Sequence, residues 1–153
     1  SFREKRGAFV TLNTYPDLSL RGCIGFPEPI YSLASALVQA AHHACHDPRF
    51  DDLRAEELDG IVVEVSILSP PQEVHVVERR ELPGEIVIGR DGLIIEYGPY
   101  RGLLLPQVAT EYGWDATTFL DQTCIKAGFL GRCWDAGDVD VLTFEGQIFS
   151  EKP

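Results

Sequence analysis

Two short N-terminal stretches, residues 8–12 and 18–24, are rich in apolar residues and lie on either side of the polar segment 13–17. Such stretches are β-like, and the Asn, Pro and Asp between them favour a turn. Apolar residues then recur at helical spacing from residue 30 to about residue 46. Asp47-Pro48 ends that segment, because a residue before proline avoids the α region. The pattern predicts a β-hairpin followed by a helix.

The middle of the chain reads as strands. Residues 61–68 are rich in β-branched side chains and predict a central strand, with Ile, Val, Val and Ile on one face. Residues 86–88, 93–97 and 103–105 predict three short strands, because glycine-containing turns separate them. We expect these three strands to form an antiparallel meander.

Two helices and a final pair of strands are predicted after residue 105. Pro106 suits the first turn of a helix that runs to Tyr112. Asp115 can cap a second helix that Gly128 ends. The predicted core face of this second helix consists of Phe119, Leu120, Cys124 and Ala127. Strand-like residues 139–145 and 147–149 follow, and without a βαβ rhythm the fold class is α+β with a mainly antiparallel sheet.

Composition and charge narrow the class of function. The chain has 153 residues, the size of a single domain, and no apolar run approaches the roughly 18 residues of a membrane span. Thirteen Lys and Arg against 24 Asp and Glu give a formal net charge of −11. Such a field repels phosphate backbones and anionic lipids, so we expect neither nucleic acid nor membrane as a partner.

Four cysteines, Cys23, Cys45, Cys124 and Cys133, lack the CxxC spacing of zinc and redox sites. No signal-peptide pattern is visible, so we expect reduced thiols and a cytoplasmic location. The motifs GxSxG, HExxH, GxGxxG and the P-loop are absent from the sequence, which removes the enzyme classes that they mark.

The hexapeptide Leu20–Gly25, LRGCIG, is the most informative segment. On an extended strand, Arg21 and Cys23 point to the same face, and a nearby cation stabilises a thiolate relative to a thiol. Gly22 and Gly25 carry no side chain that would keep a ligand from the backbone. The segment therefore indicates a reactive or ligand-contacting cysteine. The alternative is a small buried cysteine beside an exposed arginine.

A histidine-rich helix end offers a second candidate. His42, Cys45 and His46 lie at i, i+3 and i+4, so three metal ligands can share one helical face. No fourth ligand is recognisable in the sequence, and histidines at a helix C terminus also suit the helix dipole. We therefore predict no metal site.

Further candidates stand elsewhere in the chain. Glu64 and Ser66 share one face of an otherwise apolar strand, where burial makes a carboxylate a better proton acceptor, although that face can equally meet solvent. Asp47-Pro48-Arg49-Phe50 has the spacing of a capping turn with an Asp/Arg pair, and Cys124 suits core packing.

Together these segments resemble the AMMECR-one domain family. The resemblance covers residue 7 almost to the C terminus, and LRGCIG is highly specific to that family. The matching segments are Gly7–Leu12, Leu20–Gly25, Asp47–Phe50, Glu64–Leu68, Gly102–Val108 and Cys124–Gly128. Residues 1–153 would then form a single such domain without the family's N-terminal helical segment.

The resemblance implies a larger antiparallel α+β part, a smaller subdomain packed beside it, and a cleft toward which Cys23 faces. The family has no established activity and no assigned cofactor. Suggestions range from an enzyme that uses the cysteine to a regulatory role. In microbes such domains are associated with Memo-type and radical S-adenosylmethionine proteins, which implies a shared modification pathway.

The family pattern also implies which residues line the cleft. It places Arg21, Gly22, Cys23 and Gly25 there, followed by Asp47, Arg49, Glu64, Ser66, Gln107, Cys124 and Lys126. Our leading hypothesis is an enzyme-like domain in which Cys23 is the nucleophile, Arg21 activates it and binds an anionic group, and Glu64 is the acid or base. The alternative is an adaptor domain that recognises a protein or a small metabolite without turnover.

Overall fold

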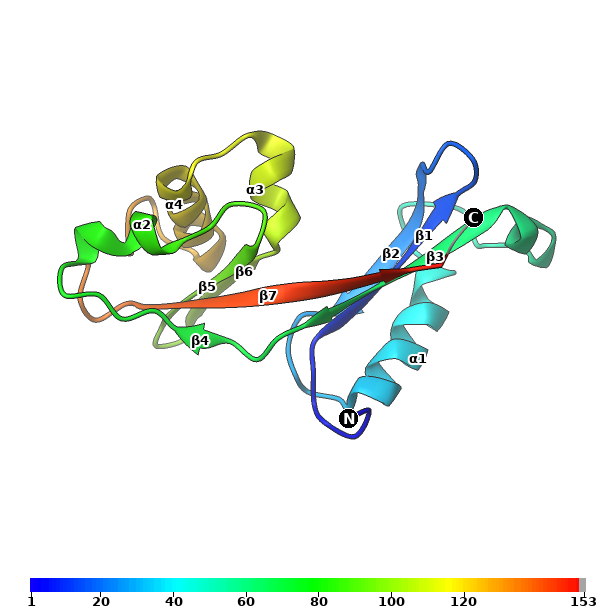
Figure 1. Ribbon diagram of the computed structural model, residues 1–153, viewed down its shortest axis with the longest axis horizontal. Helices are drawn as coiled ribbons and strands as arrows, with labels where there is room; N and C mark the ends of the chain where they lie inside the picture. Colours follow the sequence, from blue (N-terminus) through cyan, green and yellow to red (C-terminus); the bar gives the residue numbers. More distant parts are fainter. Residues whose placement is uncertain (152–153) are drawn as a thin grey trace. The chain divides into compact units, whose positions relative to one another are not determined.

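The computed structural model describes residues 1–151, which divide into two compact units. The first unit comprises Ser1–Pro70 and the chain from Gln147 onward, and the second comprises Pro71–Gly146. Strand β7, Asp140–Ser150, contributes to both units (Figure 1). Both units consist of antiparallel strands and helices, which confirms the predicted α+β class.

Three strands form the sheet of the first unit: β1, Ala8–Thr14; β2, Leu20–Phe26; and β3, Ile61–Leu68. Strand β1 pairs antiparallel with β2 on one side and with β3 on the other. The predicted hairpin is therefore confirmed. Strand β3 lies between β1 and β7, as a central strand should, whereas β2 is at the edge.

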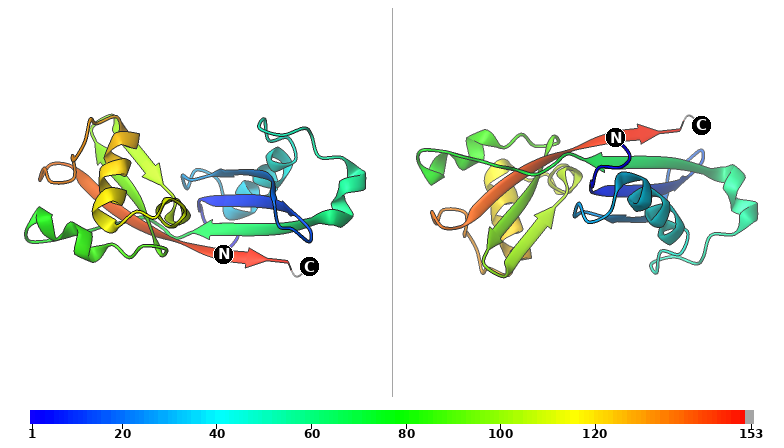
Figure 2. Two further views of the ribbon diagram at one scale, coloured as in Figure 1. Left: turned by 90° about the horizontal axis from the view of Figure 1, so that it is seen from above. Right: turned by 90° about the horizontal axis from the view of Figure 1, so that it is seen from below.

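Helix α1, Leu33–Ala44, covers one face of this sheet (Figures 1 and 2). Its buried alanines, Ala40 and Ala44, pack against Val10 and Leu12 of β1. The small alanine side chains of the helix let its axis come close to the strands. The helix begins after residue 30 because the Ser32 hydroxyl caps it by accepting the Ser35 N–H.

A long connection, residues 45–60, leads from α1 to β3 and ends in the 3₁₀ turn η1, Ala55–Gly60. The sequence patterns did not predict this turn. It positions several of the polar side chains described below.

The second unit has strands β4, Gln72–Glu73; β5, Asp91–Tyr97; and β6, Tyr100–Leu104, in the order β4-β7-β5-β6. The short η2, Arg79–Glu81, and α2, Leu82–Glu85, precede β5. Of the predicted three-stranded meander, the antiparallel pair of β5 and β6 is confirmed, with Leu93 opposite Leu104.

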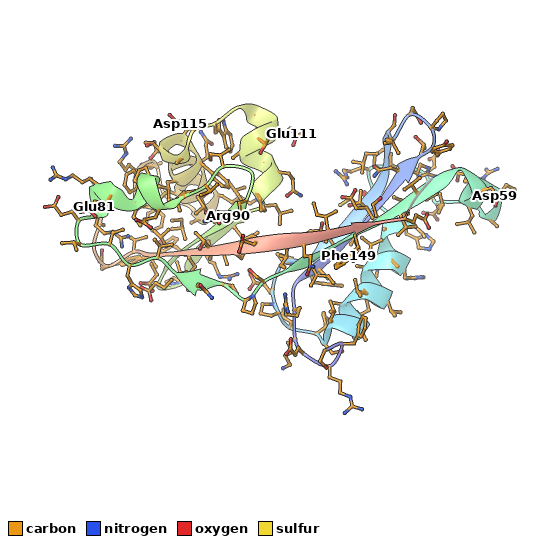
Figure 3. All side chains as sticks on the ribbon, viewed as in Figure 1. Asp59, Glu81, Arg90, Glu111, Asp115 and Phe149 are labelled. Atoms are coloured by element: carbon orange, nitrogen blue, oxygen red, sulfur yellow. A yellow bond between two sulfur atoms is a disulfide. The ribbon has the colours of Figure 1, made fainter. Side chains whose placement is uncertain are left out.

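Helices α3, Pro106–Tyr112, and α4, Ala116–Ala127, agree with the prediction. Asp115, labelled in Figure 3, caps α4 by accepting the Thr118 N–H, and Gly128 ends it at a φ of 107°. The predicted core face of α4 is buried. It packs on β5 and β6.

Two predicted strands differ from the structure. Residues 86–88 are not a strand, because the chain turns there: the Val87 carbonyl accepts the Arg90 and Asp91 N–H groups, and Gly89 adopts a φ of 91°. The two closing strands form the single strand β7. The glycine at 146 does not interrupt it.

Candidate functional site

Thr11 lies at the centre of a polar row across the sheet of the first unit. It is directly opposite Cys23 on β2 and opposite Glu64 on β3. Directly opposite residues share one face of a sheet. Because Ala8, Val10 and Leu12 face α1, the row lies on the other face. Gly25 and Ser66, both opposite Phe9, lie on that face as well.

The Thr11 hydroxyl oxygen is 3.3 Å from the Cys23 sulfur, within hydrogen-bonding distance. Both side chains are partly buried. Glu64 is also partly buried, but it stands two strands from Cys23, a separation of about 10 Å between the backbones. Thr11 therefore lies between the cysteine and the glutamate in the sheet.

Asp47 and Arg49 bind the outer edge of β2 at Cys23, and we call these two residues the Asp47–Arg49 pair. Asp47 Oδ2 accepts the Cys23 N–H at 3.0 Å, and Arg49 Nη2 donates to the Cys23 carbonyl at 3.3 Å. Arg49 also donates to both carboxylate oxygens, from Nε at 3.1 Å and from Nη2 at 2.7 Å. The pair thus satisfies the edge of β2 as a neighbouring strand would.

Because the backbone of Cys23 bonds outward to this pair, its opposite residue Thr11 is a non-hydrogen-bonded partner. In such pairs the two strands approach more closely than in hydrogen-bonded pairs. That geometry explains the short contact between the hydroxyl and the thiol.

The charges of the Asp47–Arg49 pair support each other. Asp47 is 2% exposed, and the Arg49 guanidinium, followed by the Cys23 N–H, holds the pKa of its carboxyl well below the usual range. Asp47, and to a smaller extent Cys23, raises the pKa of Arg49. Arg49 is therefore the cation that interacts with Cys23.

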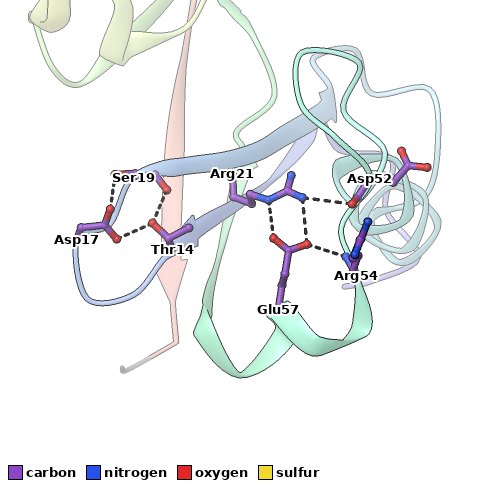
Figure 4. A network of polar contacts seen from close by, with 7 residues as sticks. All are labelled: Thr14, Asp17, Ser19, Arg21, Asp52, Arg54 and Glu57. Atoms are coloured by element: carbon purple, nitrogen blue, oxygen red, sulfur yellow. Dashed lines mark hydrogen bonds and ion pairs between the residues drawn. The ribbon is translucent and has the colours of Figure 1, made fainter.

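Arg21 does not lie beside the thiol, which corrects the expectation from simple alternation. The pairing of β1 with β2 shifts between Leu12 and Asn13, and Arg21 has no partner in it. The guanidinium instead binds Glu57 on η1, with Nε and Nη2 each 3.1 Å from a carboxylate oxygen (Figure 4). Glu57, the main cause, raises the pKa of Arg21, and Arg21 in turn lowers the pKa of Glu57.

Arg21 and Glu57 form part of the wall of an open surface pocket with a volume of about 560 Å³. Arg21 also donates to the Asp52 carbonyl at 3.3 Å, and this bond ties the connection after α1 to β2. The full lining consists of Arg21, Asp51, Asp52, Leu53, Arg54 and Glu57.

Gly22 and Gly25 leave room for other parts of the protein. A Cβ at Gly22 would lie 2.3 Å from the Ala44 carbonyl oxygen of α1. A Cβ at Gly25 would lie 2.4 Å from the Ala8 carbonyl oxygen and 2.5 Å from the Phe9 ring. The hexapeptide needs both glycines for packing, and the space beside each is filled by this chain.

The three remaining predicted binding residues belong to the second unit. Cys124 is 0% exposed and forms a disulfide with Cys133, so its sulfur is not available to a ligand. This bond also corrects the expectation of four reduced thiols, whereas Cys23 and Cys45 are free. Gln107 on α3 and Lys126 on α4 are exposed, and their role in a common site remains a prediction.

The histidine-rich end of α1 has a polar environment. The rings of His42 and His46 meet edge to face with 5.1 Å between their centroids, and His46 Nδ1 is 3.2 Å from Asp52 Oδ1. Within residues 1–151, no group of three or more His, Cys, Asp or Glu side chains is arranged to hold a metal ion.

Sequence reasoning missed Thr11 as a contact of the thiol and assigned to Arg21 a position that Arg49 occupies. The signal for Thr11 was its polar side chain between the apolar Val10 and Leu12. Its partner across the hairpin depends on the register, which alternation alone does not give.

The fold and site together define a class: an α+β protein with antiparallel sheets that presents a partly buried cysteine on an edge strand. The family model for AMMECR1 matches residues 1–149, and the chain belongs to the AMMECR1 family. Protein MJ0810 of Methanocaldococcus jannaschii is 58% identical over 151 residues, which are 98% of this chain and 75% of that protein. Protein PH0010 of Pyrococcus horikoshii is 52% identical over 153 residues, which cover 97% of this chain and 74% of that protein.

A crystal structure of PH0010, titled an uncharacterized protein, has the same fold. It matches 99% of this chain and 76% of its own chain with a TM-score of 0.79 and 50% identity. In the part of the chain that the structure describes, no helix is long and apolar enough to cross a membrane.

Proposed function

We propose that this chain is an enzyme or enzyme-like domain in which Cys23 is the nucleophile or covalent ligand. The contact between the Thr11 hydroxyl and the Cys23 sulfur carries the proposal, because it gives the thiol a polar neighbour on a partly buried face. The sulfur forms a bond to an electrophilic carbon of the substrate while the bond from that carbon to its leaving group breaks, and the leaving group departs with the bonding electron pair. The proton of the thiol passes to the Thr11 hydroxyl, which hands its own proton to Glu64.

The supporting residues have distinct roles in this proposal. The Asp47–Arg49 pair fixes the backbone of Cys23 and places the Arg49 guanidinium at the Cys23 carbonyl. Glu64 is the proton acceptor. Arg21, which we first expected to activate the thiol, shapes the pocket beside η1 instead. The family resemblance further suggests a modification pathway shared with Memo-like and radical S-adenosylmethionine proteins.

Alkylation by iodoacetamide tests the nucleophile directly. The rate at Cys23 should exceed that of glutathione at the same pH several-fold, and Cys45, the other free cysteine, is an internal control. Peptide mass spectrometry separates the two sites. Thr11→Val keeps the shape of the side chain and removes the hydroxyl, so it should slow labelling of Cys23 and leave Cys45 unchanged. A Cys23 rate no greater than that of glutathione would refute the proposal.

A second candidate function is a binding or adaptor domain. It is favoured by the absence, among the described residues, of a histidine or carboxylate in direct contact with the Cys23 sulfur. Recognition without turnover needs no such base. Cys23→Ser separates the two functions in a cell extract. If the chain is an adaptor, the variant retains its partner and no chemical conversion is lost. If a chemical conversion is lost while the partner is retained, a pure adaptor is excluded.

A further inference from the structure

Arg49 has hydrogen-bond donors that the protein does not use. A guanidinium carries five N–H groups in a planar fork. Nε donates to Asp47, and Nη2 donates to Asp47 and to the Cys23 carbonyl. Within residues 1–151, no acceptor bonds to the two N–H groups of Nη1. These donors are free to bind a ligand.

The free side of Arg49 faces solvent next to the cysteine. The Arg49 side chain is 58% exposed, whereas that of Asp47 is 1% exposed. The positive end of the pair is therefore outward and its negative end inward. Arg49 Nη2 donates to the carbonyl of Cys23, which lies 26 residues earlier in the chain. A group bound at Nη1 would lie next to the residue that carries the thiol.

We infer that Nη1 of Arg49 binds an anionic group, a carboxylate or a phosphate, of the compound that reacts with Cys23. Planar oxyanions match the fork of an arginine and form short, charge-assisted hydrogen bonds with it. The inference rests on the proposed function and adds the class of substrate to it. The rest of the chain, with a net charge of −11, repels anions, so this preference is local to Arg49.

Arg90 in the second unit provides a matched control. It binds Asp91 through Nε and Nη2 at 2.9 and 3.0 Å, much as Arg49 binds Asp47. Its side chain is 54% exposed, and its Nε is also 3.6 Å from Glu145. Arg90→Gln therefore removes a similar charge that does not contact Cys23.

Two alkylating agents that differ chiefly in charge test the inference. Iodoacetate and iodoacetamide both transfer a CH₂ carbon to sulfur and release iodide, but only iodoacetate is anionic. The ratio of the iodoacetate rate to the iodoacetamide rate should be about five-fold higher at Cys23 than at glutathione. Arg49→Gln should lower the ratio to that of glutathione, and Arg90→Gln should leave it unchanged. Peptide mass spectrometry reports Cys23 separately from Cys45.

Protection experiments identify the type of anion. Inorganic phosphate that slows the iodoacetate reaction more than acetate does at equal ionic strength indicates a phosphate-bearing substrate, and the reverse order indicates a carboxylate. If Arg49→Gln fails to fold, salt replaces it as the test. The preference of the wild type should fall as ionic strength rises, because Arg49 is exposed.

A Cys23 ratio equal to that of glutathione, or one that Arg49→Gln retains, overturns the inference. This outcome is separate from failure of the proposed function. Fast iodoacetamide labelling without an iodoacetate preference leaves the nucleophile standing and removes the anion site. Slow iodoacetamide labelling with a preserved preference for iodoacetate leaves the anion site standing and removes the nucleophile.

Discussion

The Asp47–Arg49 pair of the first unit and the corresponding pair of Asp91 and Arg90 in the second are built alike. Each carboxylate is 2% exposed, accepts a backbone N–H from another segment, and holds an arginine through Nε and Nη2. In the second unit the N–H belongs to Val87, at 2.8 Å. The same bonding pattern fixes the edge strand β2 in one unit and a turn before β5 in the other.

The two pairs differ in what surrounds the guanidinium. Arg90, labelled in Figure 3, has a second carboxylate, Glu145, within 3.6 Å. Arg49 has instead the carbonyl of Cys23 and the ring of Phe50, whose centroid is 5.6 Å from the guanidinium carbon. A buried aspartate that holds an exposed arginine is thus a structural device in both units, and we expect the neighbour of the arginine to decide whether the pair also has a chemical role.

Removal of the two carboxylates is the largest change that tests this comparison. Asp47→Ala and Asp91→Ala should each lower the free energy of unfolding by about 3 kcal/mol, because each leaves a backbone N–H and a guanidinium without their partner. Urea unfolding measures the loss. Hydrogen exchange should show local effects: the Cys23 amide is exposed only in the first variant and the Val87 amide only in the second.

Similar exchange of the Cys23 amide in the wild type and in Asp47→Ala would contradict the role of the pair at the edge of β2. A cost for Asp47→Ala below about 1 kcal/mol would do the same, since it is typical of a surface ion pair. Asp91→Ala is the matched control for the general effect of deleting a buried carboxylate.

Part of this site was predictable from the sequence. The spacing of Asp47-Pro48-Arg49 predicted a turn with an Asp/Arg pair, and the apolar stretches on either side of residues 13–17 predicted the hairpin of β1 and β2. The bonds from this pair to Cys23, 24 and 26 residues earlier, were not predictable. They depend on how α1 places its C-terminal end against β2, which is a property of tertiary packing.

The position of Arg21 was predicted incorrectly for a related reason. Alternation assumes regular pairing, but the register of β1 and β2 shifts between Leu12 and Asn13. Such an irregularity changes where a side chain points, and a period of two in the sequence does not reveal it. The location of Cys23 on a strand was predicted correctly, whereas its cation could be identified only from the structure.

Substitution of the glycines next to the two Asp–Arg pairs should have a smaller effect on the free energy of unfolding. Gly22→Ala should cost about 2 kcal/mol, because the new Cβ meets a backbone oxygen of α1 at 2.3 Å and lies 3.7 Å from Asp47 Cβ. Gly92→Ala, beside Asp91, meets the ring of Phe144 instead and should disturb that core contact. Only Gly22→Ala should weaken protection of the Cys23 amide.

Gly137→Ala is the control for both, since nothing lies within 4 Å of a Cβ at that position. Its effect on the free energy of unfolding should stay within about 0.5 kcal/mol. If Gly22→Ala were equally mild, α1 would not rest on β2 as the structure shows, and the position of the Asp47–Arg49 pair would lose its explanation.

The loss of stability at acid pH should depend more on Asp47 than on an exposed carboxylate. The folded state lowers the pKa of Asp47, chiefly through Arg49, so this group stabilises the fold fully above its ordinary pKa of about 3.9. The contribution is lost as the pH falls from there toward the folded-state pKa. Asp47→Asn binds no proton in this range and should therefore flatten the decline in stability below about pH 4. Urea unfolding between pH 6 and pH 3 measures the slope.

Asp17 supplies the comparison for this effect. Thr14, followed by Ser19, lowers its pKa through hydrogen bonds in the exposed turn between β1 and β2 (Figure 4). Solvent screens an exposed group, so Asp17→Asn should change the slope less than Asp47→Asn does. An equal change in both variants would mean that burial gives the Asp47–Arg49 pair no advantage over a surface turn. The pair would then be a weak basis for holding a cation beside Cys23.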